Sequence, residues 1–190
     1  RRYLAHCRAA HRADDGGAVM KLAKVVRDAR CAAAVVQGDE AIIVCPWNSL
    51  AAERSPFALP SMLAADLLAA VEASSERVAL AEVQLCAPVS PCSKILCVGA
   101  NFSDHAVEIG QAGPKAKPQM FLRHADTLVG HGQPVVRPRA SAQFDFEGEL
   151  AVVIGRGGRH IAVDDAMGHV LGYTCFMDGS VRDYQRHAVT

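Results

Sequence analysis

Two glutamates at the start of an apolar run are the residues of this chain best suited to chemistry. Glu147 and Glu149 stand two residues apart within residues 145–155, a run typical of a β-strand. Successive side chains of a strand point to opposite faces, so the two carboxylates would share one face. The other face would pack into a core through the apolar residues Phe146, Leu150, Val152 and Ile154. Neighbouring negative charges repel, and a divalent cation with oxygen ligands would relieve that repulsion; a solvent-facing strip with two exposed acids is the alternative.

A histidine and a glutamate form a second candidate pair upstream. After a strand-like run that ends at Gly99, the sequence predicts a short helix that opens at Ser103 or Asp104. His105 and Glu108 are three residues apart and would share one face of that helix. A carboxylate beside an imidazole fixes its tautomer and raises its basicity, which is how a general base is made. An exposed His–Glu pair without a role is the alternative.

Four segments, taken in order and spacing, resemble the catalytic domain of the fumarylacetoacetate hydrolase family. They begin at Lys94, Pro118, Asp145 and Gly172, and read K-I-L-C-V-G-A-N-F-S-D-H-A-V-E, P-Q-M-F-L-R, D-F-E-G-E-L-A-V-V-I-G and G-Y-T-C-F-M-D-G-S-V-R-D-Y-Q. The chain departs from the family pattern at Phe102, where tyrosine is usual, and at Arg123, where many relatives have lysine.

The resemblance implies a metal site and a proton-transfer pair. Family members bind Mg²⁺ or Mn²⁺ through carboxylates that match Glu147, Glu149 and Asp178, and Ca²⁺ could replace them in crystals. Hard oxygen ligands suit these ions. The family uses a pair at the place of His105 and Glu108 to activate water or move a proton.

Two further residues are implied as substrate contacts. Gln185 matches a glutamine that contacts substrate in the family. Arg123 would hold a substrate carboxylate, although an outward-facing strand arginine is an equal alternative. Arg182 and Asp183 are expected to order the loop after Asp178.

The implied activity is that of a metal-dependent enzyme acting on a small-molecule 2-oxo acid. A bound cation stabilises the enolate that forms when a C–C bond breaks or a proton leaves. Hydrolysis of acylpyruvate-type substrates is the leading expectation. Decarboxylation, and keto–enol isomerisation or hydration, are alternatives within the family. An inactive metal-binding fragment of the family, or a structural β-domain stabilised by Ca²⁺, would explain the same carboxylates without catalysis.

Composition limits the partners. The chain of 190 residues carries no formal net charge, which gives no support for a nucleic-acid partner, and no apolar run is long enough to cross a membrane. Seven cysteines at irregular spacings predict reduced, mostly buried thiols in a cytoplasmic protein. Relatives are usually homodimers, so a homodimer is expected.

The predicted fold class is a mixed, β-dominated α+β fold, with the family's rolled β-sandwich and a small N-terminal α+β domain. We expect an extension of uncertain origin at residues 1–19, the small domain at residues 20–90, and a partial catalytic domain at residues 91–190. That last domain is expected to be truncated on its C-terminal side, because the family pattern continues with a lysine and further strands. Local patterns predict a hairpin at residues 31–45, helices at 61–73 and 162–170, and strands at 95–99, 119–123, 135–137 and 173–177.

Overall fold

The structure is a computed structural model, and it describes residues 9–11, 20–45, 47–49, 64–89, 94–113 and 117–187. The chain forms two compact units, one from residues 1–89 with 129–190 and the other from residues 90–128. The predicted break near residue 90 coincides with one edge of these units. Residues 129–190 group with the N-terminal segment because they join its sheet, and the predicted domain assignment itself stays a prediction.

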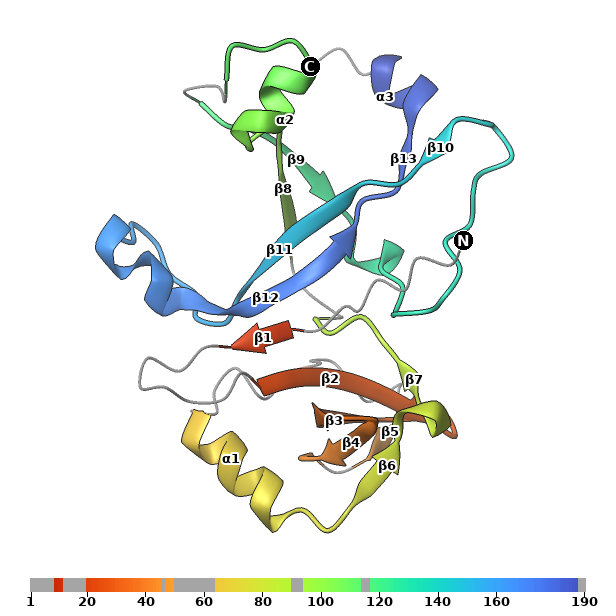
Figure 1. Ribbon diagram of the computed structural model, residues 1–190, viewed down its shortest axis with the longest axis vertical. Helices are drawn as coiled ribbons and strands as arrows, with labels where there is room; N and C mark the ends of the chain where they lie inside the picture. Colours follow the sequence, from red (N-terminus) through yellow and green to blue (C-terminus); the bar gives the residue numbers. More distant parts are fainter. Residues whose placement is uncertain are drawn as a thin grey trace. The chain divides into compact units, whose positions relative to one another are not determined.

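A long sheet runs through the first unit (Figure 1). Its strands are β1 (Ala9–His11), β2 (Met20–Arg27), β3 (Arg30–Gln37), β4 (Glu40–Ile43), β5 (Asn48–Ser49), β6 (Arg77–Ala79), β7 (Gln84–Leu85), β11 (Gly148–Ile154) and β12 (Val170–Met177). Within the described residues the order is β11-β12-β1-β2-β3-β4-β6, with β5 beside β3 and β7 beside β2. Part of the expected extension is therefore a strand, since β1 pairs with both β2 and β12.

The N-terminal strands carry the core of this unit. Both β2 and β3 are long antiparallel strands, and apart from Lys24 on β2 their buried positions are filled by small and branched apolar residues. Helix α1 (Ala64–Ala73) covers one face, where Leu67 packs with Leu22, Ala33 and Val35. The predicted hairpin is confirmed, because β3 and β4 pair across the turn at Gly38. The helix predicted at 61–73 is present as α1, and the first three residues of the predicted range lie outside the described residues.

Shorter elements complete the first unit. They are the 3₁₀ helices η2 (Leu80–Glu82) and η4 (Val163–His169), the strands β10 (Phe144–Asp145) and β13 (Ser180–Val181), and the helix α3 (Arg182–His187). The predicted helix at 162–170 is present as the 3₁₀ helix η4. The predicted strand at 135–137 is wrong, because these residues have no regular structure. They lie between Pro134 and Pro138, which have no N–H to give to a ladder.

The second unit is a hairpin with an inserted helix. Strands β8 (Ile95–Gly99) and β9 (Gln119–Arg123) pair along their whole length, and α2 (Ser103–Glu108) and the 3₁₀ helix η3 (Ala125–Thr127) follow them in the chain. Both strands and the short helix were predicted from the sequence and are confirmed. Together the two units make a β-dominated α+β protein, which is the predicted fold class.

Two packing expectations fail. The face of β11 that was expected in the core is exposed, with Phe146 at 74% and Leu150 at 58%. A period-two pattern tells which side chains share a face, but not which face a neighbouring element covers. Among the described cysteines only Cys31 is buried, and Cys175 is exposed on β12, so burial of most thiols was wrong.

Candidate carboxylate site

The three acids of the predicted metal site lie on two adjacent strands. Strands β11 and β12 are antiparallel, with Gly148 opposite Met177 and Glu149 opposite Phe176. One step further the backbone N–H of Asp178 donates to the carbonyl of Glu147 at 2.9 Å. Because residues that oppose each other share a face, the pleat places Glu147, Glu149 and Asp178 on the same face of the pair.

That face is the more buried of the two. Along β12, Gly172 and Thr174 are buried while Tyr173, Cys175 and Met177 are exposed. Asp178 continues the buried series, with 4% of its surface exposed. Glu147 is half-buried and Glu149 is exposed. The carboxylates therefore extend from a buried position at Asp178 to solvent at Glu149.

Arg182 holds two of the neighbouring acids. Its guanidinium donates to Asp145 Oδ2 through Nε at 3.0 Å and Nη2 at 2.9 Å, and Nη1 donates to Glu147 Oε1. The Arg182 hydrogen bond, with a smaller contribution from the Phe146 backbone N–H, holds the pKa of Asp145 below its usual value. Burial lowers the pKa of Arg182, but the hydrogen bonds to Asp145 and Glu147 outweigh it and raise that pKa.

The donor chemistry of these acids fits a hard divalent cation, whereas their side chains do not converge in this structure. In the described part of the chain, no three acidic, histidine or cysteine side chains are grouped closely enough to hold an ion. Glu147 turns toward Arg182 instead. A site for Mg²⁺ or Mn²⁺ would use the backbone arrangement already present, with side-chain rotation bringing the carboxylates together.

Helix α3 brings Gln185 to the same cluster. Its Oε1 accepts a hydrogen bond from Arg182 Nη1 at 3.0 Å. The neighbouring Asp183 accepts a hydrogen bond from the Ser141 hydroxyl. Arg182 and Asp183 thus both tie the segment after Asp178 to earlier residues, which agrees with the ordering role expected from the sequence.

His105 and Glu108 lie on α2, in the second unit. His105 Nδ1 is 3.4 Å from Glu108 Oε2, and both side chains are exposed. The predicted spacing on one helix face is therefore present. Their catalytic assignment stays a prediction.

Arg123 ends β9, also in the second unit, and is half-buried. Its guanidinium carbon lies 5.6 Å from the centre of the Phe121 ring, within the range of a cation–π contact. This contact is compatible with either expectation for Arg123, so its role as a substrate contact stays a prediction.

Asp145 and Ser141 belong to the hydrogen-bonded cluster around the carboxylates, and the sequence analysis did not identify either of them. The signal for Asp145 was available, because it precedes Glu147 by two residues and so belongs to the same alternation. No such signal marked Ser141, whose partner Asp183 is 42 residues away in sequence.

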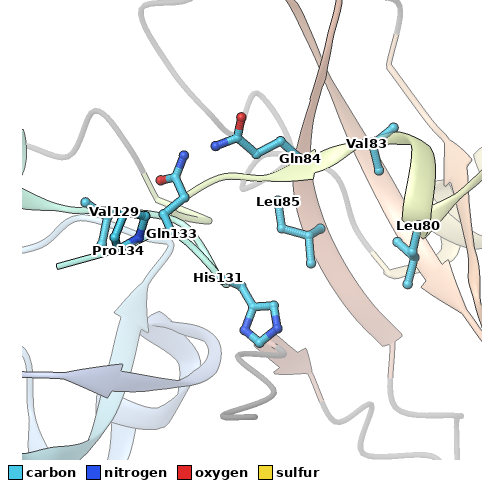
Figure 2. Close-up of a pocket in the computed structure, with 9 residues that line it drawn as sticks. Leu80, Val83, Gln84, Leu85, Val129, His131, Gln133 and Pro134 are labelled. Atoms are coloured by element: carbon cyan, nitrogen blue, oxygen red, sulfur yellow. The ribbon is translucent and has the colours of Figure 1, made fainter. Parts of the chain in front are cut away.

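A separate open depression of about 740 Å³ lies in the first unit, between residues 80–85 and 129–134 (Figure 2). Its sides carry apolar residues such as Leu80 and Leu85, with Gln84, His131 and Gln133 as polar neighbours. No predicted site residue is among those that line it. We therefore place the candidate chemistry at the carboxylates and not in this depression.

Comparison with known proteins decides the family. A family model described as Fumarylacetoacetate (FAA) hydrolase C-terminal matches residues 94–189, about half of the chain. The chain belongs to this family. The sequence resemblance is thereby confirmed.

The helices of the described residues include none that is long and apolar enough to span a membrane.

Two curated relatives of this chain carry the same activity name. Oxaloacetate tautomerase YisK from Bacillus subtilis is 42% identical over 118 residues, which are 60% of this chain and 39% of the relative. The human mitochondrial oxaloacetate tautomerase FAHD2A is 46% identical over 104 residues, 55% of this chain and 33% of the relative. The match thus spans less than two fifths of either relative.

Solved structures from the family share the fold. The 5-carboxymethyl-2-hydroxymuconate delta-isomerase from Mycobacterium smegmatis has a TM-score of 0.65 at 27% identity, covering 89% of this chain and 58% of that one. Maleylpyruvate hydrolase from Sphingobium sp. SYK-6, in complex with manganese(II) and pyruvate, has a TM-score of 0.60 at 28% identity, covering 84% and 59%. The relatives of this chain thus include proteins named as tautomerase, isomerase and hydrolase. Their names do not favour hydrolysis over the other two reactions.

Proposed function

We propose that this chain contributes a divalent-cation site at which a 2-oxo acid is converted between its keto and enol forms. The observation that carries the proposal is the register of β11 against β12. It sets Asp178 opposite Glu147 and places Glu149 on the same face. Relatives at 42% and 46% identity that are named oxaloacetate tautomerases make oxaloacetate the first substrate to test.

Glu147, Glu149 and Asp178 would hold the ion, which is Mg²⁺ or Mn²⁺ in our proposal. When bound, it would polarise the oxygen on C2 of the substrate and stabilise negative charge there. In this proposal, side chains of the protein move the substrate proton. Tautomerisation removes a proton from C3 and returns one to the oxygen on C2, so it needs no further reactant.

His105 is our candidate for the group that takes and returns this proton. Glu108, 3.4 Å from its ring, would orient the imidazole for this transfer. Gln185 is the proposed polar contact to substrate, and it already receives a hydrogen bond from Arg182. Arg123 is the proposed partner of a substrate carboxylate, because its guanidinium can bind the two carboxylate oxygens together.

Hydrolysis of a C–C bond in an acylpyruvate is the second candidate. The manganese and pyruvate complex of the maleylpyruvate hydrolase supports it, because pyruvate is the fragment that such hydrolysis releases. Both reactions pass through the same type of enolate, so the carboxylate arrangement does not separate them.

The test follows the enol absorbance of oxaloacetate with the purified chain, with added Mn²⁺ or with a chelator. We expect the chain to speed the approach to keto–enol equilibrium only when the cation is present. Release of pyruvate from an acylpyruvate, measured in parallel, would favour the second candidate. A chain that binds Mn²⁺ and accelerates neither reaction would contradict the proposed catalysis, and one stabilised by Ca²⁺ alone would favour the structural alternative.

A further inference from the structure

A buried serine ties the loop before β10 to the start of α3. Ser141 is 5% exposed, and its hydroxyl donates to the carboxylate of Asp183, with Oδ1 at 2.7 Å and Oδ2 at 2.8 Å. The same oxygen accepts the backbone N–H of Gln143 at 2.9 Å. A buried hydroxyl with both donor and acceptor functions used holds its partners in a defined geometry.

The same loop also fixes the adjacent residue. The backbone N–H of Arg182 donates to the carbonyl of Gln143 at 2.8 Å. Residues 182 and 183 are therefore held together, one through its backbone and the other through its side chain. Asp183 is itself oriented, since the N–H of Tyr184 donates to its Oδ1 at 3.1 Å.

Arg182 projects from this anchored point toward the acids. It contacts Asp145 Oδ2 with two nitrogens and Glu147 Oε1 with a third. Arg182 engages one oxygen of Glu147, and within the described residues no hydrogen bond to the other is present. A carboxylate held by one oxygen can present the second to a cation, and such outer partners commonly change metal affinity by about 10- to 100-fold.

We propose that Ser141 is a positioning residue for the carboxylate site. Through Asp183 it fixes the start of α3, so that Arg182 reaches Glu147 and sets the orientation of that carboxylate for a divalent cation. The cation part of this inference rests on the proposed function. The link from Ser141 to Arg182 does not, because it is a relationship between residues of the metal-free chain.

The test compares Ser141→Ala with Ser141→Thr, which keeps the hydroxyl, and with Ser74→Ala as the matched control. Ser74 also donates through its hydroxyl in the first unit, to the Ile43 carbonyl at 2.6 Å, and does not belong to the cluster. Two quantities are measured on the full chain: the Mn²⁺ affinity by calorimetry, and the NMR signal of the Arg182 Nε–H. Thermal unfolding reports the general loss of stability in each variant.

We expect Ser141→Ala to weaken Mn²⁺ binding about tenfold and to shift the Arg182 signal toward that of a solvated guanidinium. Ser141→Thr should restore both quantities, and Ser74→Ala should change neither at a similar loss of stability. Equal Mn²⁺ affinity in the wild type and Ser141→Ala, or equal weakening in Ser74→Ala, would overturn the positioning role. If the wild type binds no Mn²⁺, the proposed function fails, and the Arg182 signal alone decides: an unchanged signal in Ser141→Ala overturns the link.

Discussion

Asp178 lies directly opposite Glu147 across β11 and β12, with its N–H donating to the Glu147 carbonyl at 2.9 Å. This backbone contact places the two acidic residues at opposing positions of the paired strands, and Glu149 lies on the same face. Because the backbone makes this contact, the charge of one acidic side chain can be removed to test the cation site while the strands stay paired.

Glu149→Gln should weaken Mn²⁺ binding at least tenfold, which is about 1.4 kcal/mol. Glu149 is exposed, so the change removes a ligand charge at little cost to folding. Calorimetry with Mn²⁺ measures the effect. Glu72→Gln, which removes an exposed charge on α1, should bind as the wild type does. An unchanged affinity in Glu149→Gln would exclude this residue as a ligand.

His105→Gln should reduce cation-dependent tautomerisation of oxaloacetate by about 100-fold or more, the size expected for loss of a general base. Its Mn²⁺ affinity should stay at the wild-type value, because His105 is not one of the proposed ligands. Asp104→Asn, on the same short helix, is the matched control and should keep its rate. Wild-type turnover in His105→Gln would assign proton transfer to another group.

Gly130→Ala should destabilise the chain by about 2 kcal/mol, within the usual cost of overpacking. A Cβ at Gly130 would lie 2.0 Å from the Leu85 carbonyl oxygen, and this backbone atom cannot rotate away. Denaturant unfolding measures the loss. Gly157→Ala meets no atom within 4 Å and should be nearly neutral; similar losses in both variants would contradict the close approach.

Ala29→Gly should stabilise the chain by about 0.5 kcal/mol. The β2–β3 turn holds Asp28 at φ 51° and Ala29 at φ 56°, a conformation that alanine adopts at a cost and glycine without one. Part of this gain is lost because glycine gives the unfolded chain more freedom. Thermal unfolding checks the sign, and Ala33→Gly in buried β3 should show the opposite one.

Cys86 should react with iodoacetamide more slowly than Cys175 at neutral pH. Burial raises the pKa of Cys86, an effect that the nearby Lys24 reduces but does not reverse. The thiolate is the reactive form, so the Cys86 rate should grow as the pH rises toward this raised pKa. Cys175 is exposed and serves as the internal reference. Peptide mass spectrometry reads both rates, and faster labelling of Cys86 at neutral pH would contradict the assignment.

Local sequence was sufficient for the parts of this fold that depend on neighbouring residues. The hairpin of β3 and β4, strands β8 and β9, and helix α2 follow from alternation, turn residues and short-range spacing. The pairing of His105 with Glu108 belongs to the same class, because three residues along a helix return to one face. The shared face of Glu147 and Glu149 also follows from the two-residue period alone.

Tertiary structure alone decided which face of β11 is covered and what its acids touch. The pattern put Phe146 and Leu150 in the core, yet both are exposed, because burial depends on the element packed against a strand and not on the strand's own period. The hydrogen bonds from Arg182 to Asp145 and from Ser141 to Asp183 join residues 37 and 42 positions apart. Such contacts form only when the strand register brings distant segments together, and no local signal in the sequence encodes that distance.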